Sequence, residues 1–360
     1  MGGGPAGSSL AWGLRDAGLD VVVLDRRRFP RDKTCAGWVT PAVFEALAVD
    51  PELYAKTRVL QPLHGFAVRR IGDRQARVRW PEPVSYGIRR CELDHFLLER
   101  AEATLRLGEP LERLERRGGR WILNDSLSAP LLVGAGGHFC PVARRLAPVG
   151  APEAIVAAKE VEFRLDASQA AACPVEAEVP ELFFTRDLRG YGWVFRKGDW
   201  LNVGLGRQDK SRLSAQLEGF LASAFQGHAY LLYGQTERPL VGEGFALVGD
   251  AAGLAYPRSG EGIRPAVESG LLLARPVRRA GRPDAPQALE AYAEAVEARL
   301  GLRRPRRRPG LTDLLPAGAT RWLAGRLLGS AWFARHVVVE RWFVHAELPA
   351  LGEARIAATG

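Results

Sequence analysis

The sequence predicts an α/β protein of two domains in an α+β arrangement, with a Rossmann-like nucleotide-binding domain, an antiparallel-sheet domain and a helical C-terminal extension. Three observations support this fold class. A glycine-rich fingerprint opens the chain, and a middle region (about 151–239) holds segments that alternate apolar and polar residues. The 40 glycines and 24 prolines in 360 residues favour short strands and turns over long helices. At roughly 150 residues per domain, this length allows about two domains.

Composition narrows the class of protein. With 47% hydrophobic and 25% charged residues, the chain is neither disordered nor collagen-like. No apolar run approaches the roughly 18 consecutive residues that a membrane span requires. The net charge of +9 favours anionic ligands without choosing among nucleotides, lipid head groups and nucleic acid. The four cysteines form no CxxC pair, and no signal peptide precedes them, so we expect reduced thiols in a cytoplasmic protein and no metal site.

The N-terminal fingerprint comes first along the chain. Residues 2–7 read G-x-G-x-x-G, a helical stretch follows to Ala17, and the apolar strand 21–24 ends at Asp25. In nucleotide-binding βαβ units the glycines let the backbone approach a pyrophosphate, and an acidic residue about 20 positions on binds a ribose hydroxyl. Asp25 comes 23 positions after Gly2, which fits this spacing. We therefore expect a dinucleotide site here rather than a plain turn.

One part of this unit is missing from the sequence. The fingerprint should follow a β-strand, but only Met1 precedes Gly2. We expect the natural chain to begin some ten residues upstream, with an apolar strand.

Two further apolar strands run into glycine-rich turns, at 131–137 and at 245–253. After the second comes the turn Gly260-Glu261-Gly262 and a helical pattern from Ile263 to about Leu273. Because the first N–H groups of a helix lack intrahelical partners, such a turn offers donors to an anionic ligand.

The region between these turns predicts an antiparallel sheet with one wet face. Its strand-like segments are 161–165, 181–185, 192–195 and 200–205. Tyr191, Trp193 and Phe195 alternate on one strand, so all three project from one face. That face either lines an apolar cavity or packs against the domain core; alternation alone leaves both open, and the family resemblance given below favours the cavity.

The C-terminal third is predicted to be helical. Residues 286–300 have a helical pattern, and a basic run follows at 303–309. Beyond it, tryptophan, phenylalanine and leucine recur beside basic residues up to about 345, which is typical of a membrane interface or of a helical cap over a cavity. We favour the cap slightly, and no nucleic-acid fold signature accompanies the charge.

Four motifs now stand in one order: the fingerprint with Asp25, Arg90-Cys91-Glu92-Leu93-Asp94, Gly134-Ala135-Gly136-Gly137, and Gly249-Asp250-Ala251-Ala252-Gly253. This order resembles the superfamily of FAD-dependent monooxygenases and geranylgeranyl reductases, whose fold is similar to that of p-hydroxybenzoate hydroxylase. The likeness to the geranylgeranyl reductases is closer. Residues 29–38 are similar to their FPR-x-K-x-CGG stretch and residues 191–195 to their YxWxFP motif. The resemblance covers about residues 2–275.

The resemblance implies FAD as the cofactor. The first glycines would face its pyrophosphate, Asp25 the adenosine ribose, Asp250 the ribityl chain, and the turn at 260–263 the flavin ring edge. Arg90 would lie near the cofactor at the head of its helix. The implied cofactor-binding residues are Gly2, Gly4, Pro5, Ala6, Gly7, Asp25, Arg26, Lys33, Arg90, Gly249, Asp250, Gly260, Gly262 and Ile263. The implied substrate residues are Trp38, Tyr191, Trp193 and Phe195.

Several positions depart from the family pattern. Gly136 replaces the aspartate of the monooxygenases' Gly-Ala-Asp-Gly motif, which lowers the case for a hydroxylase. Arg196 and Leu188 stand where the reductase motif has prolines, so the substrate can differ from the usual one. Ala36 replaces the first glycine of CGG, a mild change.

Two side chains have both a chemical and a structural interpretation. The resemblance places Cys35 where its loop meets the flavin, as a candidate catalytic thiol, and a small buried hydrophobe is an equal alternative. His138 follows the Gly-Ala-Gly-Gly turn and is a candidate proton donor, although a lone histidine there is more often structural. Cys91 and Cys140 are expected to be packing residues.

The function that follows is an FAD-dependent oxidoreductase that reduces carbon–carbon double bonds of a prenyl lipid, by hydride transfer from reduced flavin. The alternatives are a flavin monooxygenase of an aromatic or polyketide-like substrate, and an inactive flavoprotein-derived binding module. The electron donor would be NADPH or a ferredoxin-like protein, and the oligomeric state stays open. We expect an FAD domain of 1–60, 85–150 and 240–300, a substrate domain of 61–84 and 151–239, and the extension 301–360. The extension is the segment through which the protein could touch a membrane surface, at 303–345.

Overall fold

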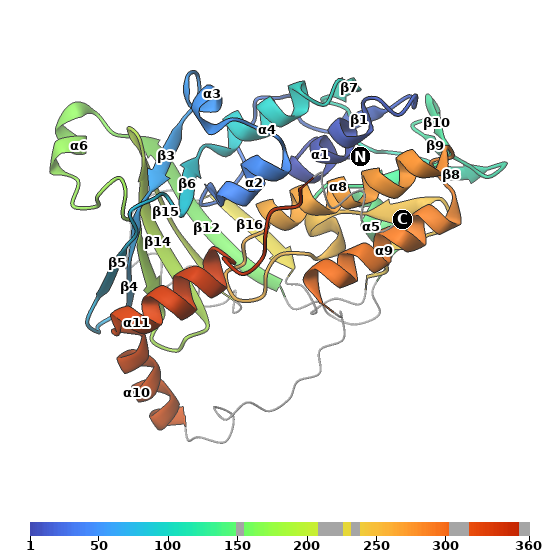
Figure 1. Cartoon of the computed structure of the whole chain (residues 1–360). Helices are drawn as coiled ribbons and strands as arrows, with labels where there is room; N and C mark the ends of the chain where they lie inside the picture. Colours follow the sequence, from blue (N-terminus) through green and yellow to red (C-terminus); the bar gives the residue numbers. More distant parts are fainter. Residues whose placement is uncertain (149–154, 208–225, 232–237, 302–316, 353–360) are drawn as a thin grey trace.

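The structure is a computed structural model that describes residues 1–148, 155–207, 226–231, 238–301 and 317–352. It has a nucleotide-binding part of small sheets and helices beside one large sheet, with the C-terminal helices against that sheet (Figure 1). This mixed α/β architecture confirms the predicted fold class.

The nucleotide-binding part contains two small sheets with parallel pairs. One is β1–β7, and the other is β11–β18–β17, in which β17 runs antiparallel to β18. The start of the chain bridges them, because Gly2 N–H donates to Leu24 O (2.8 Å) and Ala135 N–H donates to Met1 O (2.8 Å). The bounds are β1 Val22–Asp25, β7 Thr104–Leu107, β11 Leu132–Gly134, β17 Val241–Gly242 and β18 Phe245–Leu247.

Helices α1 (Pro5–Leu14) and α8 (Ile263–Ala280) pack closely against each other. Small residues permit this approach: a Cβ added at Gly13 would lie 2.6 Å from the Cβ of Ala274. Helix α8 extends a further two turns beyond the predicted end near Leu273, and α9 (Pro286–Leu300) confirms the helix predicted at 286–300. The N termini of α1 and α8 are thereby brought to one place.

The large sheet has seven strands in the order β16-β12-β15-β14-β13-β4-β5. Every neighbouring pair is antiparallel except β13–β4, which is parallel. The predicted antiparallel sheet is therefore confirmed, and one hairpin, β4–β5, joins its edge through a parallel pair. The bounds are β4 Gly65–Arg70, β5 Ala76–Arg79, β12 Ile155–Arg164, β13 Glu181–Phe184, β14 Gly190–Lys197, β15 Trp200–Arg207 and β16 Gln226–Leu231.

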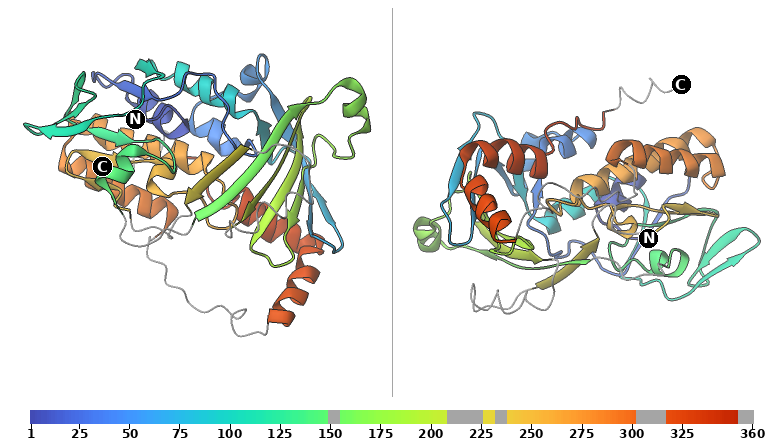
Figure 2. Two further views of the ribbon diagram at one scale, coloured as in Figure 1. Left: turned by 180° about the vertical axis from the view of Figure 1, so that it is seen from behind. Right: turned by 90° about the horizontal axis from the view of Figure 1, so that it is seen from below.

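Smaller elements complete the described chain. A three-stranded sheet β2-β6-β3 lies between the two parts, and β10-β9-β8 form hairpins at the far end (Figure 2). The remaining bounds are β2 Trp38–Val39, α2 Pro41–Ala46, α3 Pro51–Ala55, β3 Leu60–Leu63, β6 Ser85–Ile88, α4 Arg90–Glu99, β8 Leu114–Arg117, β9 Arg120–Leu123, β10 Leu127–Ala129, α5 Pro141–Leu146, α6 Ala167–Ala172 and the 3₁₀ turn η1 Gly249–Ala252.

The C-terminal helices are α10 (Ala317–Leu328), α11 (Ala331–Phe333) and the π-helix η3 (Ala334–Phe343). They lie against the large sheet (Figures 1 and 2), and Val338, Val339 and Phe343 share one buried cluster with sheet residues such as Phe66 and Trp193. The basic run 303–309 lies outside the described residues. Among the helices that the structure describes, none is long and apolar enough to cross a membrane.

Candidate active site

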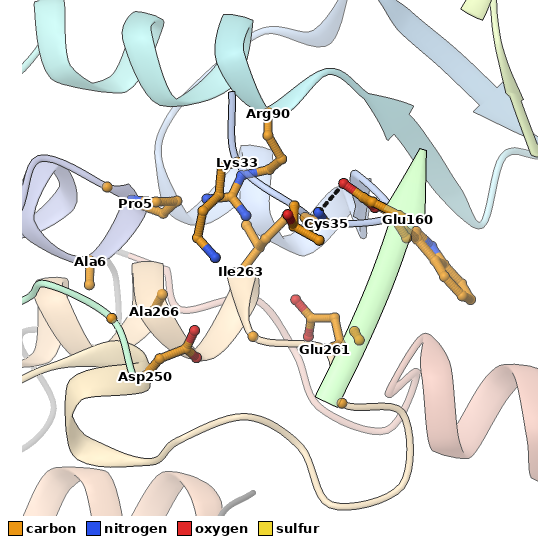
Figure 3. Close-up of a pocket in the computed structure, with 18 of the residues that line it drawn as sticks. Pro5, Ala6, Lys33, Cys35, Arg90, Glu160, Asp250, Glu261, Ile263 and Ala266 are labelled. Carbon is orange, nitrogen blue, oxygen red and sulfur yellow. Dashed lines mark hydrogen bonds between the residues drawn. The ribbon is translucent and has the colours of Figure 1, made fainter. Parts of the chain in front are cut away.

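A cavity of about 400 Å³ lies where the nucleotide-binding part meets the large sheet (Figure 3). Its lining brings together most of the predicted residues, which are far apart in the sequence. Those that line it are Gly2, Gly4, Pro5, Ala6, Asp25, Arg26, Lys33, Cys35, Trp38, Arg90, Tyr191, Trp193, Asp250, Gly260, Gly262 and Ile263. Gly7, Gly249 and Phe195 lie outside the lining.

The glycines of the fingerprint have different structural reasons. Gly2 has a φ of +107°, in the region that favours glycine, and a Cβ at Gly7 would overlap the carbonyl oxygen of Gly2. At Gly4, in contrast, the nearest atom to an added Cβ is an Arg31 nitrogen 3.6 Å away. No protein atom therefore crowds Gly4, which lines the cavity. A loop that binds a pyrophosphate through its backbone needs such open space.

Asp25 holds this loop in place. Its two oxygens accept hydrogen bonds from the backbone N–H groups of Gly3 (2.8 Å) and Arg27 (2.9 Å). No side chain caps the N terminus of α1, so its first backbone N–H groups are available to a ligand in the cavity. The predicted ribose-binding carboxylate is therefore positioned beside an anion-binding helix terminus.

Cations gather beside the fingerprint loop, where Arg31 is the nearest side chain to Gly4. Arg90 begins α4 and makes two 2.9 Å hydrogen bonds to Asp94, which also pairs with Arg31 (3.0 Å). Burial, together with the charge of Arg90, lowers the pKa of Lys33 to about 8. Three cations around one carboxylate leave this wall of the cavity positive, which suits an anionic ligand.

The turn before α8 closes the third side of the cavity. A Cβ at Gly262 would lie 3.0 Å from Asp250 Oδ1, so the turn and Asp250 are adjacent. Glu261 Oε1 accepts a hydrogen bond from Arg264 N–H (2.7 Å), whereas its Oε2 is buried and has no hydrogen-bond partner among the described residues. Burial raises the pKa of Glu261 to about 7.

Glu160, on β12, faces the cavity from the large sheet. One of its oxygens accepts a hydrogen bond from Cys35 N–H (2.5 Å; Figure 3), and the other is 3.4 Å from Asn202 Nδ2. Trp193 Nε1–H donates to Asn202 Oδ1 (2.7 Å), which fixes the orientation of that amide. Burial raises the pKa of Glu160.

The pKa of Glu162, two residues further along β12, shifts in the opposite direction. Although burial alone would raise its pKa, the adjacent charge of Lys197 and hydrogen bonds from Lys197, Asn202 and Arg89 lower it. The same amide of Asn202 donates to Glu162 (3.1 Å), so the two carboxylates of one strand share a donor. Their environments separate the two pKa values, an arrangement that often marks acid and base groups.

Sequence reasoning missed both Glu160 and Glu261. Glu160 lies just before the predicted strand segment 161–165, which contains Glu162, and two carboxylates spaced by two residues were a usable signal. Glu261 stood between two glycines that were selected for their backbone. In each case the sequence contains the residue, but only the fold shows that the carboxyl group is buried at a cavity.

The predicted substrate residues do not all face the cavity. Tyr191 lines it and its hydroxyl donates to Ser259 O, while Trp38 stacks on Phe66 (4.8 Å between centroids) and Phe343 (5.0 Å). Phe195 is only 1% exposed and belongs to the core of the large sheet, as the packing alternative for that face expected.

The remaining candidates have structural surroundings. His138 is buried, contacts the Phe139 ring (4.7 Å) and is outside the cavity lining. Cys140 is buried in the core of the nucleotide-binding part, and the four cysteines, all within the described residues, are free thiols. The described residues contain no group of three or more His, Cys, Asp or Glu that could hold a metal ion.

A second cavity, of about 560 Å³, adjoins the first. The two share Tyr191 and Gly260 in their linings. The walls of the second are mainly apolar and come from the large sheet, from the turn at 257–260 and from α10, α11 and η3, with Arg189, Arg207 and Arg258 as charged members. They include Val156, Phe184, Leu323, Leu327, Leu328, Phe333 and Trp342. The C-terminal helices therefore cap a cavity, as one of the two alternatives for this segment predicted.

Comparison with known proteins identifies relatives of the chain. No family model matches the chain. Menaquinone reductase of Mycobacterium tuberculosis is 30% identical over 315 residues, covering 76% of this chain and 74% of that protein. Digeranylgeranylglycerophospholipid reductase 2 of Methanothermobacter thermautotrophicus is 29% identical, covering 74% of each.

Solved structures agree on the fold. A geranylgeranyl bacteriochlorophyll reductase-like protein of Thermoplasma acidophilum matches with a TM-score of 0.73 at 19% identity, over 96% of both chains. A probable FAD-dependent monooxygenase of Pseudomonas aeruginosa matches with a TM-score of 0.58 at 20% identity, over 84% of this chain and 95% of that one.

The fold and the site together define an FAD-dependent oxidoreductase. The open backbone at Gly4, the carboxylate of Asp25 and the positive wall fit the cofactor that the sequence implied. Within that class, the chain belongs to the geranylgeranyl reductase family.

Proposed function

We propose that the protein reduces carbon–carbon double bonds in the prenyl chain of a lipid. The observation that carries this proposal is the apolar second cavity, which adjoins the cofactor cavity at Tyr191 and Gly260. A long apolar chain in the second cavity would reach the first one with a double bond at that junction. The names of the relatives, which refer to menaquinone and to geranylgeranyl lipids, support the same substrate class.

The residues that would hold FAD follow from the geometry. The pyrophosphate would lie on the fingerprint loop at Gly4, with the adenosine ribose on Asp25, while Asp250 and the turn at 260–263 would take the ribityl chain and the flavin ring. When bound and reduced, FAD supplies the hydride for the reaction. The chain's own residues bind, orient and exclude water around that centre.

Orientation is the main contribution of the large sheet. Tyr191 is fixed through its hydroxyl to Ser259 and lines both cavities, and Trp193 is fixed through its indole N–H to Asn202. Rigid aromatic side chains hold an alkene near the cofactor without competing chemistry, and such positioning lowers the barrier. Cys35, whose backbone N–H binds Glu160, remains a candidate for contact with the substrate.

We also propose that the lipid enters from a membrane surface. Trp322 and Trp332 are 62% and 66% exposed on the C-terminal helices, beside Leu323 and Leu327, which are both partly exposed and part of the second cavity. Amphipathic aromatic side chains next to arginines suit a lipid head-group region. The cavity and the exposed aromatic surface are therefore continuous through Leu323 and Leu327.

The electron donor is proposed to be NADPH or a ferredoxin-like protein. The sequence has no second dinucleotide fingerprint. Bleaching of the flavin absorbance by NADPH under argon would support the nicotinamide, and bleaching only by reduced ferredoxin would support the protein donor.

The test of the function is anaerobic. The FAD-loaded protein is reduced with dithionite and mixed with a geranylgeranyl lipid that carries no quinone ring, with the fully saturated lipid as the control. Recovery of the flavin absorbance, with a product heavier by two hydrogens per reduced bond, supports double-bond reduction. Recovery that needs oxygen and gives a hydroxylated product would support the monooxygenase alternative.

A further inference from the structure

A carboxyl group with no evident structural role lies beside the junction of the two cavities. Glu261 follows Gly260, which lines both cavities, and its own side chain lines the first. Figure 3 shows its carboxyl directed into the cavity on the side of Asp250 and Ile263, below Cys35. Its Oε2 is buried without a hydrogen-bond partner among the described residues.

A buried carboxylate with an oxygen that lacks a donor is costly, because the lost hydration is not replaced. The neutral acid avoids this cost, since its remaining oxygen, Oε1, still accepts the N–H of Arg264 (2.7 Å). The cation nearest in sequence, Arg264, is already paired with Glu268 (3.0 Å). Because Oε2 is buried and lacks a donor among the described residues, the structure favours a proton on Oε2.

Glu160 is the other buried carboxyl group of the cavity, and it is less suited to deliver a proton. Both its oxygens have donors, from Cys35 N–H and from Asn202. It lines the first cavity and not the second. Its network fixes the sheet and the Cys35 loop instead.

We propose that Glu261 is the proton donor to the substrate, a role that rests on the proposed double-bond reduction. One alkene carbon accepts the hydride from reduced FAD and forms a C–H bond. The π bond breaks, and its electron pair takes the proton from Glu261 Oε2 at the other carbon. The alkene is reduced by two electrons, the flavin is oxidised by two, and the Glu261 carboxylate regains a proton from solvent.

The charged groups that face Glu261 set its pH range. Burial raises its pKa to about 7, the backbone N–H groups of Arg264 and Ile263 and the charge of Arg264 oppose this rise, and Glu268 adds to it. Lys33, Arg90 and Asp250, which lies beside the turn, also line the cavity. A pKa near neutrality is the favourable value for a general acid at neutral pH.

The test compares Glu261→Gln with the exposed Glu290→Gln on α9 as the matched control. Glutamine keeps an oxygen for Arg264 N–H, so FAD binding should be unchanged. In single turnover with a prenyl lipid, E261Q should reoxidise about 100-fold more slowly, within the 10²–10⁴ that a positioned acid contributes. The wild-type rate should fall as pH rises through about 7, and that of E261Q should be flat.

A second readout needs no turnover. Infrared spectra of the FAD-loaded protein should show a carboxylic-acid C=O band that titrates near pH 7 in wild type and E290Q and is missing from E261Q. If E261Q keeps the wild-type rate, pH profile or band, or if only Glu160→Gln slows the reaction, the assignment is wrong. A wild-type protein that no prenyl lipid reoxidises would instead overturn the proposed function, and the proton donor with it.

Discussion

Alanine at Gly4 should separate cofactor binding from folding. The backbone there has a φ of −74° and a ψ of −176°, which alanine adopts freely, and the nearest atom to the new Cβ is 3.6 Å away. The loss of a glycine N-cap and the lower entropy of the unfolded chain oppose each other, so the free energy of unfolding should change by about 0.5 kcal/mol or less.

The same methyl group would stand in the cradle of the pyrophosphate. If it prevents one or two charge-assisted hydrogen bonds from the loop, at about 1.5–3 kcal/mol each, the free energy of FAD binding should weaken by about 1.5–6 kcal/mol, which is at least roughly 10-fold in affinity. The matched variant is Gly7→Ala, whose Cβ would overlap the carbonyl oxygen of Gly2. It should destabilise the apoprotein itself, by about 1–3 kcal/mol.

The assay is urea unfolding of the two apoproteins and a fluorescence titration of each with FAD. Gly4→Ala should unfold at the same urea concentration as wild type and bind FAD weakly. Gly7→Ala should unfold at a lower urea concentration. A Gly4→Ala protein with wild-type affinity for FAD would refute the placement of the pyrophosphate on this loop.

Three further outcomes follow from the structure. Trp193→Phe removes the 2.7 Å donor to buried Asn202 and should cost about 1–3 kcal/mol of unfolding free energy, measured in urea; no change would mean that water replaces the indole. Because the folded pKa of Glu261, about 7, lies above its ordinary 4.5, its contribution to stability is full below pH 4.5 and is lost as pH rises to 7. Wild type should lose up to about 3 kcal/mol more than Glu261→Gln over that range, and parallel pH curves would contradict it. Trp322→Ala combined with Trp332→Ala should reduce sedimentation with anionic vesicles while leaving FAD content unchanged, and undiminished sedimentation would exclude this surface.

The sequence was most informative where function depends on local backbone conformation. The fingerprint predicted a cradle because only glycine tolerates the φ of Gly2 and the close contact of Gly7, and such requirements are local. Helix 286–300 and the alternating strands were likewise local patterns, and the fold confirms them. The parallel pairing of β13 with β4 was not predictable, because nothing in either strand specifies a partner more than 100 residues away.

The roles of side chains depend on long-range contacts. The alternation of residues along a strand does not show whether a face lines a cavity or packs in the core. Tyr191, Trp193 and Phe195 share one face, as predicted, yet the face passes from the cavity into the core along its length, so Phe195 is buried at 1% exposure. For the same reason, the sequence does not show which acidic side chains the fold buries. A glutamate in a polar-looking turn is ordinarily solvated, and the pKa of Glu261 rises to about 7 because the fold buries it beside the cavity. The chemistry of this site therefore depends on the meeting of the two parts of the fold, which no single segment encodes.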